Sequence, residues 1–274
     1  MSEKHFPYGK YVLITGGTSG IGLSCARKFA SYGYSVYAVS RSAGERSEKC
    51  GDGLISYKKC DVSDLDSIKA LYKETGSVGT VVHCAGFGIA GSAEDTPVSD
   101  AARQIDVNYL GVIRVNSVYL PGMRSNGGGI VVVVSSVAGI VSIPFQSHYS
   151  SSKFALEAYA EALRNEAGPF GIKVTVVEPG DTRTGFTNGR KMCIPDGSPY
   201  GQMCTASVKK MEQDELHGGA PEACASVIFK NSRKKNPPVK TVIGLKYKLL
   251  SFGIKILPSR LRVFVVGKLY CPRV

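Results

Sequence analysis

A tyrosine and a lysine near the middle of the chain have the spacing of a proton-transfer pair. Tyr149 and Lys153 lie four positions apart, and Ser136 stands thirteen residues before the tyrosine. Residues four apart share one face of a helix, and an ammonium beside a phenol favours the phenolate, so we expect the pKa of Tyr149 to fall from its usual value of about 10. Such a phenol can exchange a proton with a carbonyl oxygen, which Ser136 could also contact. Taken alone, the spacing is most often an ordinary pair on a helix surface.

This chemistry also needs a hydride carrier, and the N-terminal segment has a pattern that binds one. The apolar run 11–14 predicts a buried strand, Gly16, Gly20 and Gly22 follow it, and a helical pattern begins at Leu23. Strand, glycine turn and helix is the context of a dinucleotide site, because glycines let a pyrophosphate approach the backbone and the helix N-terminus offers free N–H groups. The spacing is Gly-x-x-x-Gly-x-Gly, and a plain turn is the alternative interpretation.

The end of the second predicted strand, 35–40, indicates which dinucleotide binds. An acidic residue at this position would hold the ribose hydroxyl of NAD, whereas a basic residue suits the 2′-phosphate of NADP. Here the strand runs into Arg41, and no acid appears before Glu45. The planar guanidinium fork matches phosphate, so we expect NADP(H). A solvated arginine is the alternative.

The remaining pattern predicts the fold class. Predicted strand segments at 54–60, 80–86, 130–134 and 172–177 alternate with helical segments. This alternation predicts one α/β domain over residues 1–238, a Rossmann-like doubly wound parallel sheet with helices on both faces. The β-branched run 130–134 is typical of a central strand, and it ends at Ser136, on the sheet edge where such folds bind ligands.

Several polar residues at the ends of these elements have two interpretations. Asp61 could accept a hydrogen bond from an adenine amino group, while Ser63 beside it suits the N-cap of the next helix. His83 is expected to be structural rather than a base. Asn108 is poorly placed by propensity in a helix interior, which indicates a local backbone or water contact, with a surface asparagine as the alternative.

The segment 181–219 is a candidate lid over the substrate. It is rich in Gly, Pro and Met, and its apolar residues could form an inner face: Phe186, Met192, Ile194, Tyr200 and Met203. Methionines adapt to irregular apolar ligands but serve equally well as core filler.

Residues 239–274 form a basic amphipathic extension. The net charge is +12, and the last 45 residues hold twelve Lys and Arg with no acid, while the rest of the chain has 22 residues of each sign. Cations and apolar residues recur at helical spacing over 246–257, Pro258 breaks the run, and Ser259 suits the N-cap of a second helix reaching about Tyr270. The composition suits an interfacial helix on anionic lipid, with packing over the substrate cleft or onto another subunit as the alternative. Nucleic acid is not an expected partner, since no recognised module or stacking pattern is present.

The composition indicates the class of protein and argues against disulfides, a metal site and a membrane-spanning helix. The chain has 274 residues, of which 43% are hydrophobic and 20% charged, as in ordinary globular proteins. None of the eight cysteines forms a Cys-x-x-Cys pair or a His/Cys cluster, so we expect free thiols and no metal. Without a signal-like apolar core or a run of eighteen apolar residues, the sequence predicts a cytoplasmic protein whose membrane contact, if any, is peripheral.

The motifs together resemble the short-chain dehydrogenase/reductase family over about residues 9–230. The resemblance implies that Tyr149 is the general acid/base, that Ser136 orients and polarises the substrate oxygen, and that Lys153 lowers the tyrosine pKa and holds the nicotinamide ribose. It implies that Asn108 holds a water linking Lys153 to solvent. The cofactor-binding residues it implies are Gly16, Thr18, Ser19, Gly20, Ile21, Gly22, Arg41, Asp61, Val62, Ala85, Gly86, Asn108, Tyr149, Lys153, Pro179, Gly180 and Thr182. One departure is His83-Cys84, where the family usually has Asn-Asn.

Within that family the chain looks like enzymes acting on hydroxysteroids, retinoids and related lipophilic alcohols, on the basis of Arg41, the loop containing Phe145 and the segment 182–186. This implies an NADP(H)-dependent oxidoreductase that interconverts a secondary alcohol and a ketone or aldehyde, with Phe145, Phe186 and Met192 touching the substrate. A polar or carrier-linked 3-oxoacyl or sugar-type substrate is the first alternative, and a non-catalytic dinucleotide sensor is the second. The family usually forms homodimers or homotetramers, and we expect one of these.

Overall fold

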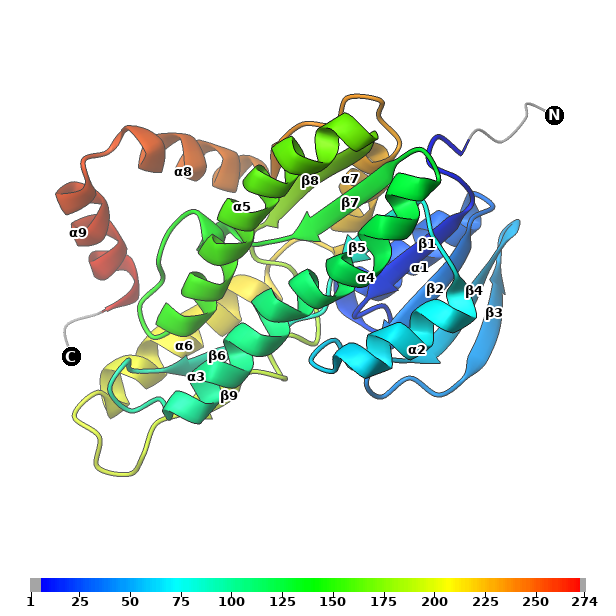
Figure 1. Cartoon of the computed structure of the whole chain (residues 1–274). Coiled ribbons are helices and arrows are strands. Elements are labelled where there is room, and N and C mark those ends of the chain that lie inside the picture. The colour runs from blue at the N-terminus through cyan, green and yellow to red at the C-terminus, as the bar shows by residue number, and fades with distance from the viewer. Residues whose placement is uncertain (1–5, 272–274) are drawn as a thin grey trace.

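The computed structural model describes residues 6–271, and an eight-stranded sheet organises it (Figure 1). The strand order is β10-β8-β7-β5-β1-β2-β4-β3, and every strand is parallel to its neighbours except β3, which is antiparallel to β4. The strands are β1 (Tyr11–Thr15), β2 (Ser35–Ser40), β3 (Arg46–Cys50), β4 (Gly53–Lys59), β5 (Thr80–His83), β7 (Gly129–Val134), β8 (Ile172–Pro179) and β10 (Lys240–Ile243). A separate pair joins β6 (Ile89–Gly91) to β9 (Lys191–Cys193).

Helices cover both faces of the large sheet, which confirms the predicted doubly wound fold. One apolar layer lies between the sheet and α2, α4 and α5, and a second lies between the sheet and α1 and α7. Strands β5 and β7 are buried throughout, as the β-branched run predicts for strands covered on both faces. The helices are α1 (Gly20–Ser31), α2 (Leu65–Thr75), α3 (Val98–Ile105), α4 (Gly111–Ser125), α5 (Ser147–Ala167), α6 (Gly201–Leu216), α7 (Pro221–Ser232), α8 (Leu245–Ile256) and α9 (Ser259–Tyr270).

Four local predictions differ from the structure. Strand β3 was not expected, because its residues Arg-Ser-Glu-Lys-Cys lack the apolar alternation of a half-buried strand. Strand β10 extends the parallel sheet beside β8, so the predicted extension 239–274 begins with a strand of the catalytic sheet. The N-cap of α2 is Asp64, not Ser63, since the Asp64 carboxylate accepts from the Asp66 N–H. Helix α9 has Pro258 at its N-cap position, and Ser259 is its first helical residue.

The predicted lid is an ordered part of the fold. Strand β9 pairs with β6, and Thr182 bridges to Gly219, so both ends of the segment 181–219 are tied down. Helix α6 packs its Cys204 and Val208 side chains against Ala90 of β6. The eight cysteines are all free thiols, as expected. Within the described part of the chain, no helix is long and apolar enough to cross a membrane.

Candidate active site

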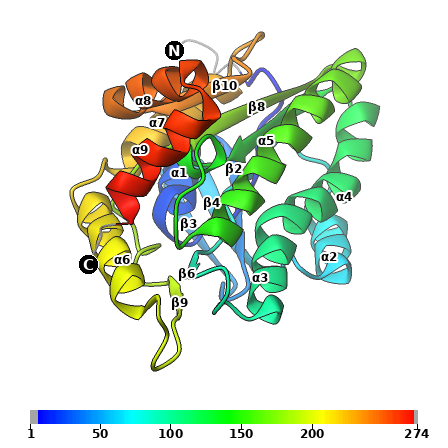
Figure 2. The same cartoon turned by 90° about the vertical axis from the view of Figure 1, so that its left-hand side faces the viewer.

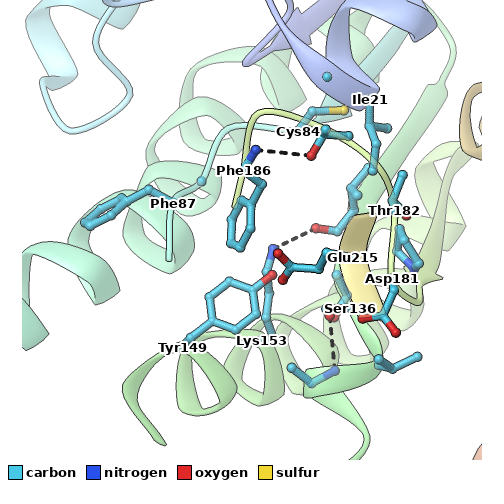
Figure 3. A pocket seen from close by; sticks show the side chains of 18 of the residues that line it. Ile21, Cys84, Phe87, Ser136, Tyr149, Lys153, Asp181, Thr182, Phe186 and Glu215 are labelled. Atoms are coloured by element: carbon cyan, nitrogen blue, oxygen red, sulfur yellow. Dashed lines mark hydrogen bonds between the residues drawn. The ribbon is translucent and has the colours of Figure 1, made fainter. Parts of the chain in front are cut away.

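The candidate site lies at the carboxyl edge of the sheet, where β1, β5, β7 and β8 end side by side. Strand β7 leads into Ser136, and helix α5 brings Tyr149 and Lys153 to the same cavity. Figure 3 shows the Tyr149 and Lys153 side chains pointing from α5 into this space, with Ser136 beside them. The three residues thus converge although they come from two elements.

The pKa of Tyr149 does not fall as the sequence led us to expect. The side chain is only 9% exposed, and burial raises its pKa to about 12, against a smaller lowering by the Ser136 hydroxyl. Lys153 is also buried, which lowers its pKa to about 8. Its Nζ donates to the Val134 carbonyl oxygen at 3.0 Å and lies 5.7 Å from the centroid of the Tyr149 ring. The ammonium is therefore held by the backbone of β7, and burial decides the direction in which the pKa of Tyr149 moves.

Ser136 caps the short 3-10 turn that follows β7. Its Oγ accepts from the Ala138 N–H at 3.1 Å, which fixes the side chain at the cavity wall. A hydroxyl has a further donor and acceptor capacity, so Ser136 can still bond an oxygen placed in the cavity.

Asn108 lies in a π-helical turn, Asp106–Leu110, between α3 and α4. Its side chain is fully buried and bonds the Phe87 backbone through both groups: Oδ1 accepts from the N–H and Nδ2 donates to the carbonyl, each at 3.0 Å. Nδ2 also contacts the Ser152 hydroxyl at 3.2 Å. The expectation of a local backbone role is confirmed, and the surface alternative is wrong. Turns of this kind recur at functional sites because they re-aim one side chain.

The turn after β1 fits a dinucleotide. A Cβ at Gly22 would lie 2.2 Å from the Gly16 carbonyl oxygen, and Gly16 itself has φ of +66°, so both positions require glycine. Ser19 at the N-cap of α1 makes no side-chain capping bond, and the first turn of the helix has no acid. Its N–H groups and positive dipole end are therefore available to a pyrophosphate.

Arg41 lies directly beside this turn. The Gly17 N–H donates to the Val39 carbonyl at 3.1 Å, and Thr18 bonds Ser40 at 3.0 Å, so the end of β2 is attached to the glycine turn. The Arg41 side chain is exposed. The pKa of Asp61 is lowered on balance: burial raises it, two hydrogen bonds from Ser63 lower it, and the charges of Arg41 and Arg103 lower it further. Neighbouring Val62 is buried against Gly111.

The other expected cofactor residues border the same cavity. Ala85 and Gly86 follow β5, and Pro179, Gly180 and Thr182 follow β8. Of the three expected substrate residues, only Phe186 lines the cavity, with its ring centroid 5.5 Å from that of Tyr149. Phe145 packs instead against the cluster of Ala90, Cys204 and Val208, and Met192 of β9 is 44% exposed.

Comparisons with known proteins agree with this geometry. The sequence profile of the short chain dehydrogenase family matches residues 10–192. This chain belongs to the short-chain dehydrogenase/reductase family. It is 34% identical over 235 residues to the 3-ketodihydrosphingosine reductase of Bacteroides thetaiotaomicron, which covers 85% of this chain and 87% of that protein. It is 33% identical over 273 residues to the probable short-chain type dehydrogenase/reductase VdlC of Helicobacter pylori, with 93% and 98% covered. The crystal structure of a short-chain dehydrogenase from Streptomyces avermitilis matches with a TM-score of 0.79 at 25% identity, covering 96% of this chain and 97% of that one.

This short-chain dehydrogenase is therefore an oxidoreductase of a family that uses nicotinamide dinucleotides. Its departure from the usual Asn-Asn is structural. His83 is buried at the end of β5, and its Nε2 lies 2.9 Å from Asn116 Oδ1, which agrees with the structural role expected for it.

Sequence reasoning missed an ion pair beside the tyrosine of this dehydrogenase. Arg190 has a side chain that is 1% exposed and pairs with Glu215 of α6, which also accepts from the Thr187 hydroxyl. Glu215 lines the cavity and raises the pKa of Tyr149, whereas Arg190 lowers it. No spacing or motif links residues 190 and 215, so only the packing of α6 over the site could have found them.

The C-terminal helices also reach the cavity. The Tyr247 ring of α8 lies against Gly180, where a Cβ would be 2.1 Å from it, and its hydroxyl bonds the Asp181 carboxylate. Burial raises the pKa of Asp181, and that bond lowers it. Tyr270 of α9 lines the cavity directly. Figure 2 shows α6, α8 and α9 together on this side of the molecule.

Proposed function

We propose that this protein is an NADP(H)-dependent reductase of a lipophilic ketone, with the matching alcohol oxidation as the reverse reaction. The observation that carries the proposal is the convergence of Tyr149, Ser136 and Lys153 in one cavity that begins at the glycine turn of α1. The glycine turn, the uncapped N-terminus of α1 and Arg41 would hold the cofactor, with Arg41 on its 2′-phosphate.

The protonation state of Tyr149 favours the reductive direction. With a pKa of about 12, the phenol carries its proton at neutral pH and can donate it to the oxygen of a carbonyl that is being reduced. Forming the phenolate needed for alcohol oxidation therefore costs on the order of 3 kcal/mol more than it would for a phenol of ordinary pKa. Bound NADPH supplies the hydride for the carbonyl carbon. Ser136 orients the same oxygen by hydrogen bonding. The Lys153 ammonium, 5.7 Å from the ring centroid, would stabilise the phenolate that remains after the proton has been donated.

The lining of the cavity supports an apolar substrate. The residues that line the cavity include five large apolar side chains, beside polar groups such as Gln146 and Glu215: Phe87, Ile143, Phe186, Met211 and Tyr270. The relative from Bacteroides reduces a keto lipid by its name, so a long-chain 3-keto lipid is the first substrate to test. A steroid ketone or retinal is the next, since these also bury a large apolar surface.

Turnover with purified protein tests the proposal. NADPH consumption is followed with a long-chain 3-keto lipid, a steroid ketone, retinal and a carrier-linked 3-oxoacyl thioester, and NADH is run in parallel. We expect turnover with NADPH on a lipid ketone. Activity on the carrier-linked thioester alone would refute the lipophilic substrate, and equal use of NADH would refute the role of Arg41.

Two tyrosine variants test the mechanism. Tyr149→Phe should lower turnover by about a hundredfold or more while NADPH binding, followed by fluorescence, stays within about twofold. Tyr159→Phe is the matched control, because its hydroxyl lies on the same helix but bonds Asn116. A Tyr149→Phe enzyme with the rate of the control would contradict the proton-donor role.

For the cofactor, Arg41→Ala should weaken NADPH binding by about 10- to 100-fold, the loss expected for a charged hydrogen bond, and leave NADH binding unchanged. Arg124→Ala, at the far end of α4, is the control. Equal loss for both cofactors would contradict phosphate recognition.

A further inference from the structure

Helices α8 and α9 leave a large apolar surface uncovered. Of the 21 large hydrophobic side chains that are exposed among the described residues, ten lie in these two helices. They are Leu245, Leu249, Leu250, Phe252, Ile256, Leu261, Val263, Phe264, Val265 and Leu269. A concentration of this kind is unusual for the surface of a free-standing soluble domain and marks an interaction site.

Helix α8 has one face packed on the protein and an apolar face on the opposite side. Its inner stripe is Tyr247, Ser251 and Ile254, which face the protein. The outer stripe, Leu245, Leu249, Phe252 and Ile256, recurs at the same helical spacing and is between 66% and 75% exposed. Residues at i, i+4, i+7 and i+11 share one helix face, so the outer stripe points away from the body of the molecule.

Helix α9 is even less covered. Only Val266 is buried, against Val141 and Ile254, and Tyr270 reaches the cavity. The remaining apolar residues face outward, with Val263 70% and Phe264 59% exposed. In Figure 1 the two helices form the outermost elements beyond α5, joined by a bend at Pro258.

The charge around this surface has one sign. Residues 245–270 contain six Lys and Arg and no Asp or Glu. Lys246 and Lys248 are exposed at the sides of the outer stripe of α8, and Arg260 is exposed at the start of α9. Apolar side chains flanked only by cations match a membrane interface, where the apolar face enters the acyl boundary and the cations meet anionic headgroups.

We propose that the outer face of α8 and α9 docks on an anionic lipid bilayer. A symmetric contact with a second copy would bring the cations of both copies together, and their repulsion disfavours a dimer through this face. Because no described helix can span a bilayer, the two helices would lie on the membrane rather than cross it.

Docking would also position the cavity. Tyr270 lines the cavity from the same helix that carries Val263 and Phe264, so the cavity wall would sit at the lipid surface. A lipid ketone could then enter from the bilayer past α9. This second step rests on the proposed function, whereas docking itself does not.

Vesicle binding tests the docking without substrate. Cosedimentation is measured with phosphatidylcholine vesicles and with vesicles that also contain phosphatidylserine. We expect the full chain to bind only the anionic vesicles, and less tightly as salt rises. Leu249→Ser, Phe252→Ser and Phe264→Ser combined should weaken binding at least tenfold, as should Lys246→Glu, Lys248→Glu and Arg260→Glu combined. Val98→Ser, Phe170→Ser and Leu216→Ser combined is the matched control, because these residues are equally exposed elsewhere.

Absence of binding, equal binding to neutral vesicles, or unchanged binding by both α8–α9 variants would overturn the proposal. So would a change of oligomeric state in the serine variant, seen by light scattering, since the face would then be a subunit interface. With the substrate supplied in vesicles, the serine variant should lose at least tenfold in turnover but keep its rate on a water-soluble ketone. If vesicle binding is found and no ketone is reduced, the docking stands and the proposed function fails.

Discussion

Replacing His83 by glutamine tests whether one buried imidazole makes the stability of this fold depend on pH. His83 ends β5, is 2% exposed, and bonds Asn116 Oδ1 through Nε2 at 2.9 Å. Burial lowers its pKa from 6.5 to about 4, although the Asn116 bond raises it slightly. Glutamine can offer an amide N–H of similar reach to Asn116 and does not titrate.

Acidification should lower the unfolding free energy, because the proton binds more tightly to His83 in the unfolded chain. The folded pKa lies below the unfolded value, so the unfolded chain takes up the proton first. The contribution of neutral His83 to the unfolding free energy is fully present above the unfolded pKa of 6.5 and is lost as the pH falls toward 4. The lowered pKa of His83 corresponds to about 3 kcal/mol of unfolding free energy in full, of which about 2 kcal/mol is lost between pH of about 7 and about 5.

Urea unfolding at these two pH values measures the effect. The wild-type protein should lose about 2 kcal/mol more unfolding free energy on acidification than His83→Gln. Other groups that titrate in this range are common to both proteins and cancel in the difference. His217→Gln, at the exposed C-terminus of α6, should behave as the wild type. An equal loss in the wild type and His83→Gln would refute the assignment of the pH dependence to this residue.

Three further perturbations follow from single contacts. Gly22→Ala places a methyl 2.2 Å from the Gly16 carbonyl oxygen, so NADPH affinity should fall by about tenfold or more in a fluorescence titration. Gly168→Ala, which has open space around it, is the control. Equal NADPH affinities of the two variants would contradict a cofactor-binding role of the glycine turn. Glu215→Gln removes a charge that raises the pKa of Tyr149, so the loss of reductase kcat at alkaline pH should move to lower pH. An unchanged pH profile would contradict an effect of Glu215 on the tyrosine. Lys240→Ala leaves the buried Glu157 carboxylate without its 2.9 Å partner, so the unfolding free energy measured in urea should fall by about 1–3 kcal/mol. Glu161→Gln changes the exposed partner of Lys240 and should lower the unfolding free energy little. Equal losses in the two variants would show that burial of Glu157 is not decisive.

The sequence determined the features that depend on neighbours along the chain. The glycine turn, the strand that precedes it and the buried β7 run are all local patterns, because backbone freedom and apolar periodicity act over a few residues. Tyr149 and Lys153 lie on one helix face for the same reason. The doubly wound fold followed from the alternation of such segments, and the two C-terminal helices followed from their periodicity and Pro258.

The tertiary structure decided what depends on burial and on distant partners. The direction of the Tyr149 pKa shift was predicted wrongly, since the desolvation that raises it is a property of the closed cavity and not of the Tyr-x-x-x-Lys spacing. The pairing of Arg190 with Glu215 and the packing of Phe145 against Ala90, Cys204 and Val208 both depend on where α6 lies in the folded chain. The residues of β3 are polar, and they form a strand by pairing with β4. Which side of α8 packs and which stays exposed was likewise open, because both sides carry large apolar residues. Only the contacts of Tyr247 with Gly180 and of Ile254 with Val141 distinguish the two sides.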